Sequence, residues 1–311
     1  MNKKLILPNL IIAGVPKAGT TSLFTYLNAH PEISGSIVKE TCYFLPLRFE
    51  QDIQSLSEYT KFFKVYGEPK YILESTPGYF YGNRIIPQII KDNLQNVKII
   101  LIFREPLSRL ISFYNHMKNV LKINKYVTFK EYLELCLKYN ENYFANKHFK
   151  EREEDVKYRG IIDGFYSLFI DEWINTFNNN LKIIFFEEFV KNPYSVMLDI
   201  CRWLDINKKF YTDYKFAIDN RSIMYKNKQL HFFGIFINKR LEFFWRQYPT
   251  LKRFFREVYY KINDSSMSSK LRISDLDRKI TTEIQTIFRP YNEAFYNKLQ
   301  KMGFQKVPWD L

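Results

Sequence analysis

The sequence predicts an α/β protein in which a single domain is built on a parallel β-sheet with helices on both faces. Short apolar runs of strand length alternate along the chain with stretches of helical spacing. Each run is continuously apolar, as is typical of strands buried on both faces of a parallel sheet. The 311 residues, 46% of them hydrophobic, are sufficient for one large domain.

The first strand and helix flank a loop bounded by glycines. PNLIIAG (8–14) predicts a short buried strand, and TTSLFTYLNAH (20–30) predicts a helix that begins at the threonines of the loop. YILES (71–75) predicts a second strand, followed by a turn at residues 76–78. This strand–loop–helix order is that of a parallel sheet with helical connections.

The strongest strand signal is VKIILIFR (97–104), with six apolar residues before the final arginine. A helix follows over PLSRLISFYNHMKNVL (106–121), with Pro106 at its N-terminus, where a missing N–H is harmless. LKIIFFEEF (181–189) predicts another buried strand, preceded by a helix around YSLFIDEWINTF (166–177). Neither a repeat nor a low-complexity linker interrupts the pattern, so we expect one domain.

The net charge is +14 with a pI of about 9.4, which favours anionic ligands. Nucleic acid, anionic polysaccharide, nucleotide and membrane surface are all compatible with this balance. The charge is uneven, because residues 221–262 contain ten Lys and Arg against two Asp and Glu. That segment therefore carries +8 of the +14.

The cysteine and histidine content indicates whether a metal site is present, and the apolar runs indicate where the protein is located. Cys42, Cys136 and Cys201 are far apart, no C-x-x-C is present and His is scarce, so we expect reduced thiols and no metal site. The N-terminus superficially resembles a signal peptide, but Pro8 and Asn9 interrupt it and the apolar run leads into the first loop. No stretch approaches the roughly 20 apolar residues of a membrane helix, so we expect a cytoplasmic protein.

The loop GVPKAGTTSL (14–23) has the glycine spacing of a phosphate-binding loop but a displaced lysine. In the pattern G-x-x-x-x-G-K-[ST] the lysine follows the second glycine, whereas here Lys17 lies inside the loop. Backbone N–H groups and the positive end of the helix dipole suit a phosphate. An ordinary tight turn is the alternative, but the strand before, the helix after and the Lys, Thr and Ser content favour phosphate binding.

Arg104 stands where a magnesium-binding P-loop enzyme carries an aspartate at a strand end. A second cation at that position suits a metal-free site for a nucleotide with additional anionic groups. The sequence therefore disfavours an ATPase or kinase, which remains an alternative.

Two segments together resemble sulfotransferases that use 3′-phosphoadenosine 5′-phosphosulfate (PAPS). PKAGTTSLFTYLNAHPEI resembles their 5′-phosphosulfate loop, and VKIILIFREPLSRLISFYNHM resembles their 3′-phosphate-binding strand and helix. VKETCYF, LESTPGYF and IFRPYNEAFYNKL resemble further segments of the Golgi-type, heparan sulfate-like carbohydrate sulfotransferases and their bacterial relatives. The resemblance covers nearly the whole chain except 222–270.

The resemblance implies a P-loop-like sulfotransferase fold over residues 1–311, with a basic aromatic helical segment at 222–270. It implies PAPS as co-substrate, adenosine 3′,5′-bisphosphate as product and an acceptor hydroxyl on a carbohydrate. A sulfotransferase that acts on a small molecule, a lipid or a peptide tyrosine is the alternative. The implied donor-binding residues are Lys17, Ala18, Gly19, Thr20, Thr21, Ser22, Arg104, Ser112 and Arg221, and the implied acceptor-side residues are Lys39, Ser75 and Thr76.

The resemblance also implies catalytic roles. Glu40 is the base, and we expect burial beside Tyr43 and Phe44 to raise its pKa. Lys17 stays close to the bridging oxygen between phosphate and sulfate, where negative charge grows as the bond to sulfur breaks. The rival base, His116, lies one turn beyond Ser112, beside the expected 3′-phosphate site, and is interpreted as structural.

One substituted position and one acidic pair need separate interpretation. Ser75 stands where many heparan sulfate-type members carry lysine, and Lys39 is the candidate replacement cation. Glu187 and Glu188 close a predicted strand, and a structural role is favoured over a magnesium-binding one.

Residues 221–262 mix the ten basic residues with a dozen aromatic ones. Helices that pack with a solvated basic face are favoured, because apolar residues recur at three- and four-residue spacing. Acceptor contact, a membrane surface and single-stranded nucleic acid are the alternatives, and no known nucleic-acid-binding fold is present. A non-catalytic module that binds anionic glycans through this segment is a further alternative.

Overall fold

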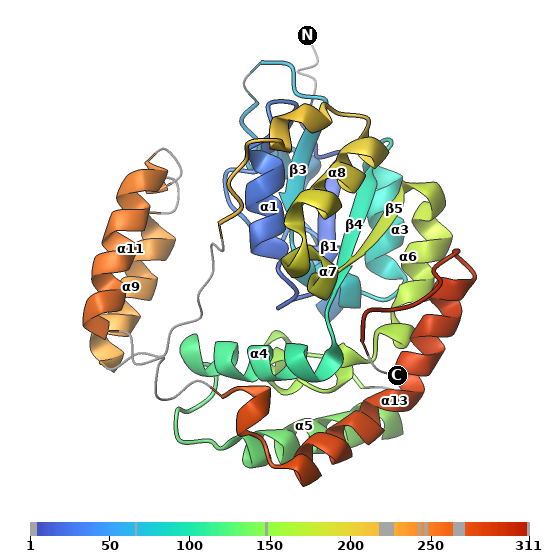
Figure 1. The fold of residues 1–311 in the computed structure, drawn as a ribbon, viewed down its shortest axis with the longest axis vertical. Coiled ribbons are helices and arrows are strands. Elements are labelled where there is room, and N and C mark those ends of the chain that lie inside the picture. The colour runs from blue at the N-terminus through green and yellow to red at the C-terminus, as the bar shows by residue number, and fades with distance from the viewer. Residues whose placement is uncertain are drawn as a thin grey trace.

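The structure is a computed structural model that describes residues 5–65, 67–146, 149–217, 227–241, 244–245, 248–263 and 271–309. Its centre is a five-stranded sheet of order β2-β3-β1-β4-β5, in which neighbouring strands run parallel (Figure 1). The strands are β1 (Leu10–Gly14), β2 (Ile33–Gly35), β3 (Tyr71–Ser75), β4 (Lys98–Phe103) and β5 (Leu181–Phe185). The predicted α/β class with a parallel sheet is confirmed.

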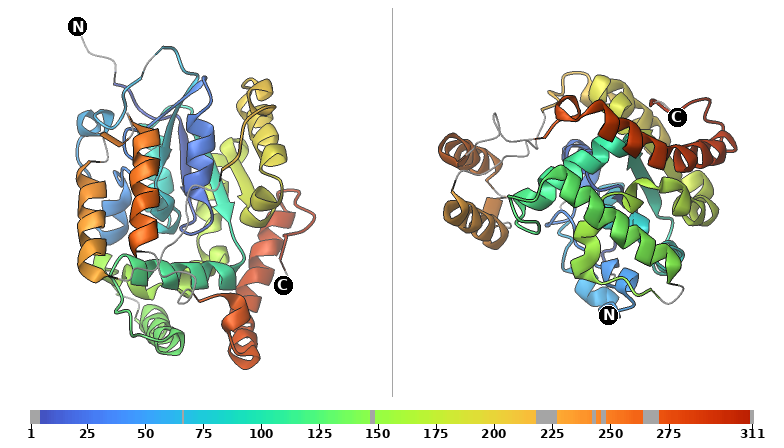
Figure 2. Two further views of the ribbon diagram at one scale, coloured as in Figure 1. Left: turned by 60° about the vertical axis from the view of Figure 1, so that its left-hand side comes forward. Right: turned by 90° about the horizontal axis from the view of Figure 1, so that it is seen from below.

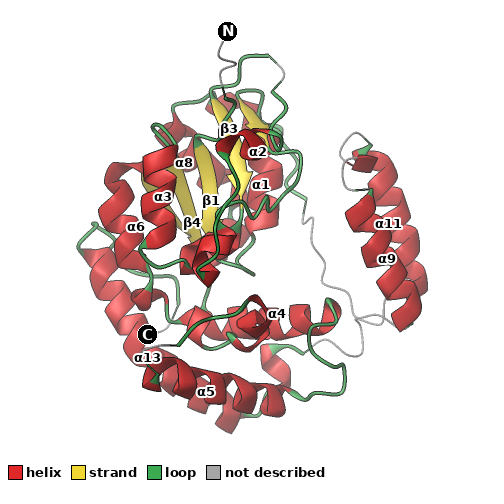
Figure 3. Ribbon diagram, turned by 180° about the vertical axis from the view of Figure 1, so that it is seen from behind, coloured by secondary structure: helices red, strands yellow, loops and turns green. Residues whose placement is uncertain are grey.

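Helices cover both faces of the sheet, which explains why the strand sequences are continuously apolar. Helices α1 (Thr20–Asn28) and α8 (Pro193–Leu204) lie on the face toward the viewer in Figure 1. Helices α3 (Ile85–Asn93) and α6 (Ile170–Phe177) lie on the opposite face, seen from behind in Figure 3. Every residue of β1 is buried. Two further short helices are α2 (Leu56–Thr60) and α7 (Phe186–Lys191), of which α7 packs against α8.

A second group of helices lies across the carboxyl-terminal edge of the sheet. Helix α4 (Pro106–Asn119) follows β4 directly, and α5 (Phe129–Ala145) and α13 (Arg278–Gln300) pack below it (Figures 1 and 2). A separate hydrophobic core joins these helices and includes Leu110, Tyr132, Phe165 and Phe288. Helix α4 therefore lies over the carboxyl ends of the strands and covers part of that edge.

Helices α9 (Lys228–Arg240) and α11 (Pro249–Asn263) form a hairpin beside the body (Figures 1 and 3). Its helical character agrees with the periodicity of the sequence. Among the helices of the described ranges, none is both long and apolar enough to cross a bilayer. The cysteines are free thiols, with Cys136 and Cys201 buried and Cys42 half-buried.

One strand prediction is wrong in length, and one strand was not predicted. The run 181–189 was expected to be one strand, but β5 ends at Phe185 and α7 begins at Phe186. The acidic pair Glu187 and Glu188 lies in the first turn of α7, where the helix dipole favours negative charge. Strand β2 was not predicted, because its three residues, ISG, give too short a pattern.

Candidate active site

The loop between β1 and α1 presents backbone donors at the carboxyl edge of the sheet. Val15 N donates to Ile102 O at 2.9 Å, which fixes the loop against β4. Lys17 and Gly19 both have positive φ angles, 71° and 85°, and turn the chain into α1. Gly19, at the N-cap position, has no side chain to satisfy the first N–H groups of the helix. This is the arrangement that binds phosphate at a helix N-terminus.

Gly19 is required both by its backbone conformation and by its neighbour. A Cβ at this position would lie 2.9 Å from Cδ2 of Phe186, and the φ of +85° disfavours any other residue. The second glycine of the loop therefore allows α7 to pack closely behind the loop. Thr20 is buried, whereas Thr21 and Ser22 are half-buried at the first turn of α1.

Arg104 connects the loop to the end of β4. Its Nη1 donates to Lys17 O at 3.1 Å, and its Cζ lies 4.5 Å from the ring centroid of Phe186. Its Nε is buried and has no hydrogen-bond partner. Burial lowers the pKa of Arg104, which nevertheless stays protonated because a guanidinium titrates far above neutrality. The two sequence motifs, 90 residues apart, therefore meet at a buried cation with an unused donor.

Helix α4 is capped firmly and turns one face toward the loop. The side chain of Glu105 accepts from Leu107 N at 2.9 Å and from Ser108 N at 2.6 Å. Ser112 is half-buried, and His116 follows one turn later on the same face. Burial and the charge of Lys17 lower the pKa of His116 to about 3, so its imidazole is a poor proton acceptor.

Glu187 has a structural contact in this region. Its Oε1 accepts from Glu105 N at 2.9 Å, which ties α7 to the start of α4. Its Oε2 is buried without a partner, and burial raises the pKa of its carboxyl group.

The segment that carries Glu40 lies against the end of β3. Glu40 N donates to Ser75 O at 2.9 Å, and Cys42 N donates to Thr76 Oγ1 at 3.1 Å. Glu40 and Cys42 have positive φ angles of 66° and 56°. Left-handed backbone at non-glycine residues costs about 1–3 kcal/mol each and clusters at functional sites. The segment is thus held in a strained conformation where the strands end.

The side chain of Glu40 is more exposed than expected. It is 51% exposed and forms an ion pair of 2.7 Å with Lys39, whose side chain is 15% exposed. The expected burial of Glu40 beside Tyr43 and Phe44 is wrong, because both rings point into the core, where Tyr43 stacks on Tyr59 with centroids 4.0 Å apart. Lys39 is therefore the immediate electrostatic partner of Glu40.

Glu74 is a carboxyl group that sequence reasoning did not single out. It is fully buried at the end of β3, and its Oε1 accepts from Thr41 Oγ1 at 3.0 Å and from Thr76 Oγ1 at 2.5 Å. Its Oε2 has no partner, and burial raises its pKa to about 7. A charged residue inside the apolar run YILES was the available signal, since carboxylates are rarely buried without a reason.

The charges of the two carboxyl groups both act on the thiol of Cys42. Burial, followed by the charges of Glu40 and then Glu74, raises the pKa of Cys42 to about 12. Cys42 is therefore a protonated thiol at neutral pH and a poor nucleophile.

The remaining predicted residues divide into two groups. Ser75 and Thr76 are buried at the end of β3, and Ser75 Oγ has no hydrogen-bond partner. Arg221 lies outside the described residues. Across the part of the chain that the structure describes, no three His, Cys, Asp or Glu side chains are grouped to hold a metal ion.

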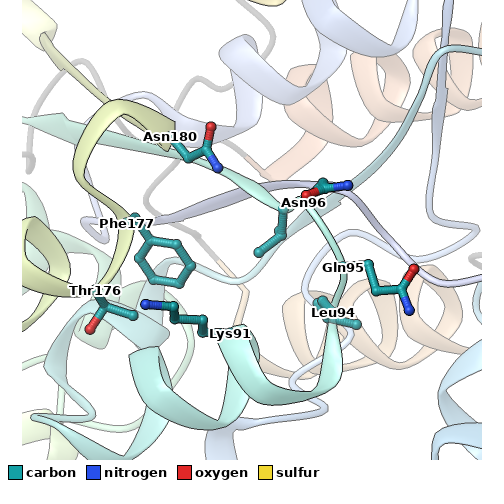
Figure 4. Close-up of a pocket in the computed structure, with 8 residues that line it drawn as sticks. Lys91, Leu94, Gln95, Asn96, Thr176, Phe177 and Asn180 are labelled. Carbon is teal, nitrogen blue, oxygen red and sulfur yellow. The ribbon is translucent and has the colours of Figure 1, made fainter.

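A surface pocket lies elsewhere and is not part of this site. It has a volume of about 430 Å³ and is lined by Lys91, Leu94, Thr176, Phe177 and others (Figure 4). It opens beside Val97 and Asn180, which precede β4 and β5. This is the amino-terminal edge of the sheet, opposite to the loop and Arg104.

Comparison with known protein families shows to which family the chain belongs. Residues 7–248 match the sulfotransferase domain family, so the chain belongs to that family. The expected resemblance to sulfotransferases, including heparan sulfate sulfotransferases, is confirmed. The fold agrees with a solved sulfotransferase from Alicyclobacillus acidocaldarius, with a TM-score of 0.57 and 21% identity over 78% of this chain and 96% of that chain.

Curated relatives are distant. The membrane-associated sulfotransferase kil1 of Dictyostelium discoideum is 27% identical over 68% of this chain and 59% of its own length. Heparan sulfate glucosamine 3-O-sulfotransferase 5 of Mus musculus is 21% identical over 93% of this chain and 71% of its own length. A bifunctional heparan sulfate N-deacetylase/N-sulfotransferase of Xenopus laevis is 25% identical over 64% of this chain, which spans only 22% of that relative.

Proposed function

We propose that this protein transfers a sulfuryl group from PAPS to a hydroxyl group of a carbohydrate and releases adenosine 3′,5′-bisphosphate. The observation that carries the proposal is the hydrogen bond of 3.1 Å from Arg104 Nη1 to Lys17 O. It joins the two motifs that the resemblance assigns to the two ends of the same nucleotide. Membership of the sulfotransferase domain family supports the same reaction class.

The residues at this edge of the sheet fit such a donor. The N-terminus of α1, from Ala18 to Ser22, offers backbone and hydroxyl donors to the 5′-phosphosulfate. The buried Nε of Arg104 is an unused donor, and a guanidinium suits the 3′-phosphate, with Ser112 on the following helix as second donor. No metal ion is required, because the protein itself supplies the cations Lys17 and Arg104.

The transfer step uses Glu40 and Lys17. Glu40 accepts the proton of the acceptor hydroxyl, whose oxygen forms a new bond to sulfur. The bond between sulfur and the bridging oxygen breaks, and that electron pair leaves with adenosine 3′,5′-bisphosphate. Lys17 stabilises the negative charge that grows on the bridging oxygen. The exposure of the Glu40 side chain leaves it accessible to an acceptor that approaches from solvent.

A carbohydrate acceptor is supported by the relatives named as heparan sulfate sulfotransferases. Lys39, 2.7 Å from Glu40, supplies a cation beside the base, which would attract an acidic sugar. Ser75 takes the place where those enzymes often carry lysine, and because its side chain is buried, Lys39 is the cation that remains beside the base.

The test is transfer from radiolabelled PAPS to a panel of acceptors: desulfated heparan oligosaccharides, neutral oligosaccharides, a simple phenol and a tyrosine peptide. Glu40→Gln should reduce turnover by about a thousandfold or more, as expected for loss of a general base. It should leave the affinity for adenosine 3′,5′-bisphosphate within about twofold, since Glu40 acts on the acceptor.

Glu50→Gln is the matched control. Glu50 is another exposed glutamate with positive φ, at 57°, and it forms an ion pair with Lys150 at 2.5 Å. Full activity of this variant would tie the loss in Glu40→Gln to the site. Transfer to the phenol or peptide alone would contradict a carbohydrate acceptor, and equal loss of turnover and nucleotide affinity in Glu40→Gln would remove its role as base.

A further inference from the structure

Hydrogen bonds join the start of α9 to the end of α11, and this end of the hairpin is called its closed base. Asn227 N donates to Asn263 Oδ1 at 2.7 Å, and Asn263 Nδ2 donates back to Asn227 O at 3.2 Å. These bonds place the start of α9 beside the end of α11. His231 is buried between the hairpin and the body, and its Nε2 lies 2.6 Å from Asn119 O at the end of α4. The hairpin is thus joined to the helix that follows β4.

The hairpin exposes many large apolar side chains. On α11, five of them recur at positions 251, 254, 255, 258 and 262, the three- and four-residue spacing of one helix face. Phe254 is 60% exposed and Ile262 is 61% exposed. On α9, Phe232 is 64% exposed and Phe233 is 57% exposed. Clusters of this kind on a water-soluble surface mark a binding interface.

Charge decides which partner covers these side chains. Residues 221–262 carry ten basic and two acidic residues, so two copies of this segment face to face would repel each other. An anionic polysaccharide would satisfy the charges but would leave aliphatic groups such as Val258 and Ile262 in water. An anionic lipid surface satisfies both requirements, because its phosphates meet the cations and its acyl boundary receives the apolar groups.

The described cations lie at the ends of the two helices. Lys228 begins α9 and Lys261 is near the end of α11, so the closed base brings them to the same end of the hairpin. Arg240 ends α9 at the other end. All three are exposed. Long basic side chains in such positions can reach lipid phosphates while the apolar residues between them enter the interface.

We propose that the α9–α11 hairpin is a peripheral membrane-binding element that lies on anionic bilayers, with Phe232, Phe254 and their apolar neighbours inserted at the headgroup–acyl boundary. The element does not span the bilayer. It would hold the site at the carboxyl edge of the sheet near a membrane surface. This inference is independent of the proposed sulfuryl transfer.

The test is co-sedimentation of the full chain with vesicles of phosphatidylcholine alone and of phosphatidylcholine mixed with phosphatidylserine, without nucleotide. We expect binding to the mixed vesicles that weakens as salt is raised, and much weaker binding to the neutral ones. The double variant Phe232→Ser/Phe254→Ser should weaken binding by roughly a hundredfold, since each buried phenyl ring contributes about tenfold or more.

A matched double variant controls for the general effect of removing exposed aromatic rings. Tyr126 and Phe144 are 78% and 51% exposed and lie outside the hairpin, so Tyr126→Ser/Phe144→Ser should bind vesicles like the unaltered protein. Circular dichroism confirms that both variants fold. Light scattering tests the alternative that a second copy of the chain covers the surface. If the unaltered protein is an oligomer and the hairpin variant is a monomer, the proposal is overturned. Equal binding by all variants, or none to mixed vesicles, would also overturn it.

Discussion

Replacing Glu74 by Gln should remove a large pH dependence from the free energy of unfolding. Glu74 Oε1 accepts hydrogen bonds from Thr41 and Thr76, whereas its Oε2 is buried without a partner. Gln keeps the size and the accepting oxygen of the side chain. It removes the charge that burial penalises.

The sign of the effect follows from the raised pKa. Burial raises the pKa of Glu74 from 4.5 to about 7, so between these values the folded protein holds a proton that the unfolded chain has released. The stability linked to this proton is fully present below pH 4.5 and is lost as the pH rises through about 7. The difference of about 2.5 between the two pKa values corresponds to about 3 kcal/mol.

Urea unfolding, followed by tryptophan fluorescence at about pH 5 and about pH 8, measures this difference. The Gln variant should gain about 2.5 kcal/mol relative to the unaltered protein between these two pH values, because it has no proton to lose there. The full effect of about 3 kcal/mol is reached only from below pH 4.5, where the carboxyl group is protonated in both states. His116 and Glu187 titrate in both proteins, and their contributions cancel in the comparison. Glu58→Gln, at an exposed ion pair with Lys61, is the control and should show no such change. The same difference in the free energy of unfolding between Glu74→Gln and the unaltered protein at both pH values would show that Glu74 does not carry this pH dependence.

Three further predictions concern the loop, the base and Arg104. Gly19→Ala should destabilise the protein by about 1–3 kcal/mol more than Gly303→Ala in urea unfolding. Both residues have positive φ, so the backbone strain is similar, but of the two only Gly19 has a neighbour, Phe186, within contact distance of the added Cβ. Equal effects would mean that α7 moves to accommodate the methyl group. Glu40→Gly should abolish turnover while stability stays level or rises by about 1 kcal/mol, since it relieves a left-handed residue, and a large loss of stability would contradict that account of the backbone. Arg104→Ala should weaken PAPS far more than adenosine 5′-phosphosulfate in competition binding, and a uniform loss would remove the assignment to the 3′-phosphate.

The sheet could be predicted where burial is complete. Residues 10–14 and 98–103 are almost entirely buried, and their continuous apolar runs predict this burial. β2 has only three residues, and its place at the edge is set by pairing with β3 rather than by its own composition. The run 181–189 continues as an apolar pattern into α7, so the pattern alone cannot show where the strand ends.

The candidate site could be predicted where it depends on topology. The rule that parallel strands carry their functional loops at one edge brings Lys17 and Arg104 together, and the hydrogen bond between them fulfils it. The environments of the two carboxylates could not be predicted. Glu74 is buried by tertiary contacts with Thr41, and Glu40 is exposed because Tyr43 and Phe44 turn into the core.

Calorimetric titration with adenosine 3′,5′-bisphosphate, ADP and ATP in the absence of magnesium tests whether the protein has a metal-free donor site for a 3′-phosphorylated nucleotide. We expect tight binding of the bisphosphate alone, because Arg104 would contact a 3′-phosphate that ADP and ATP lack. Preference for ATP, or no binding of any of the three, would contradict it.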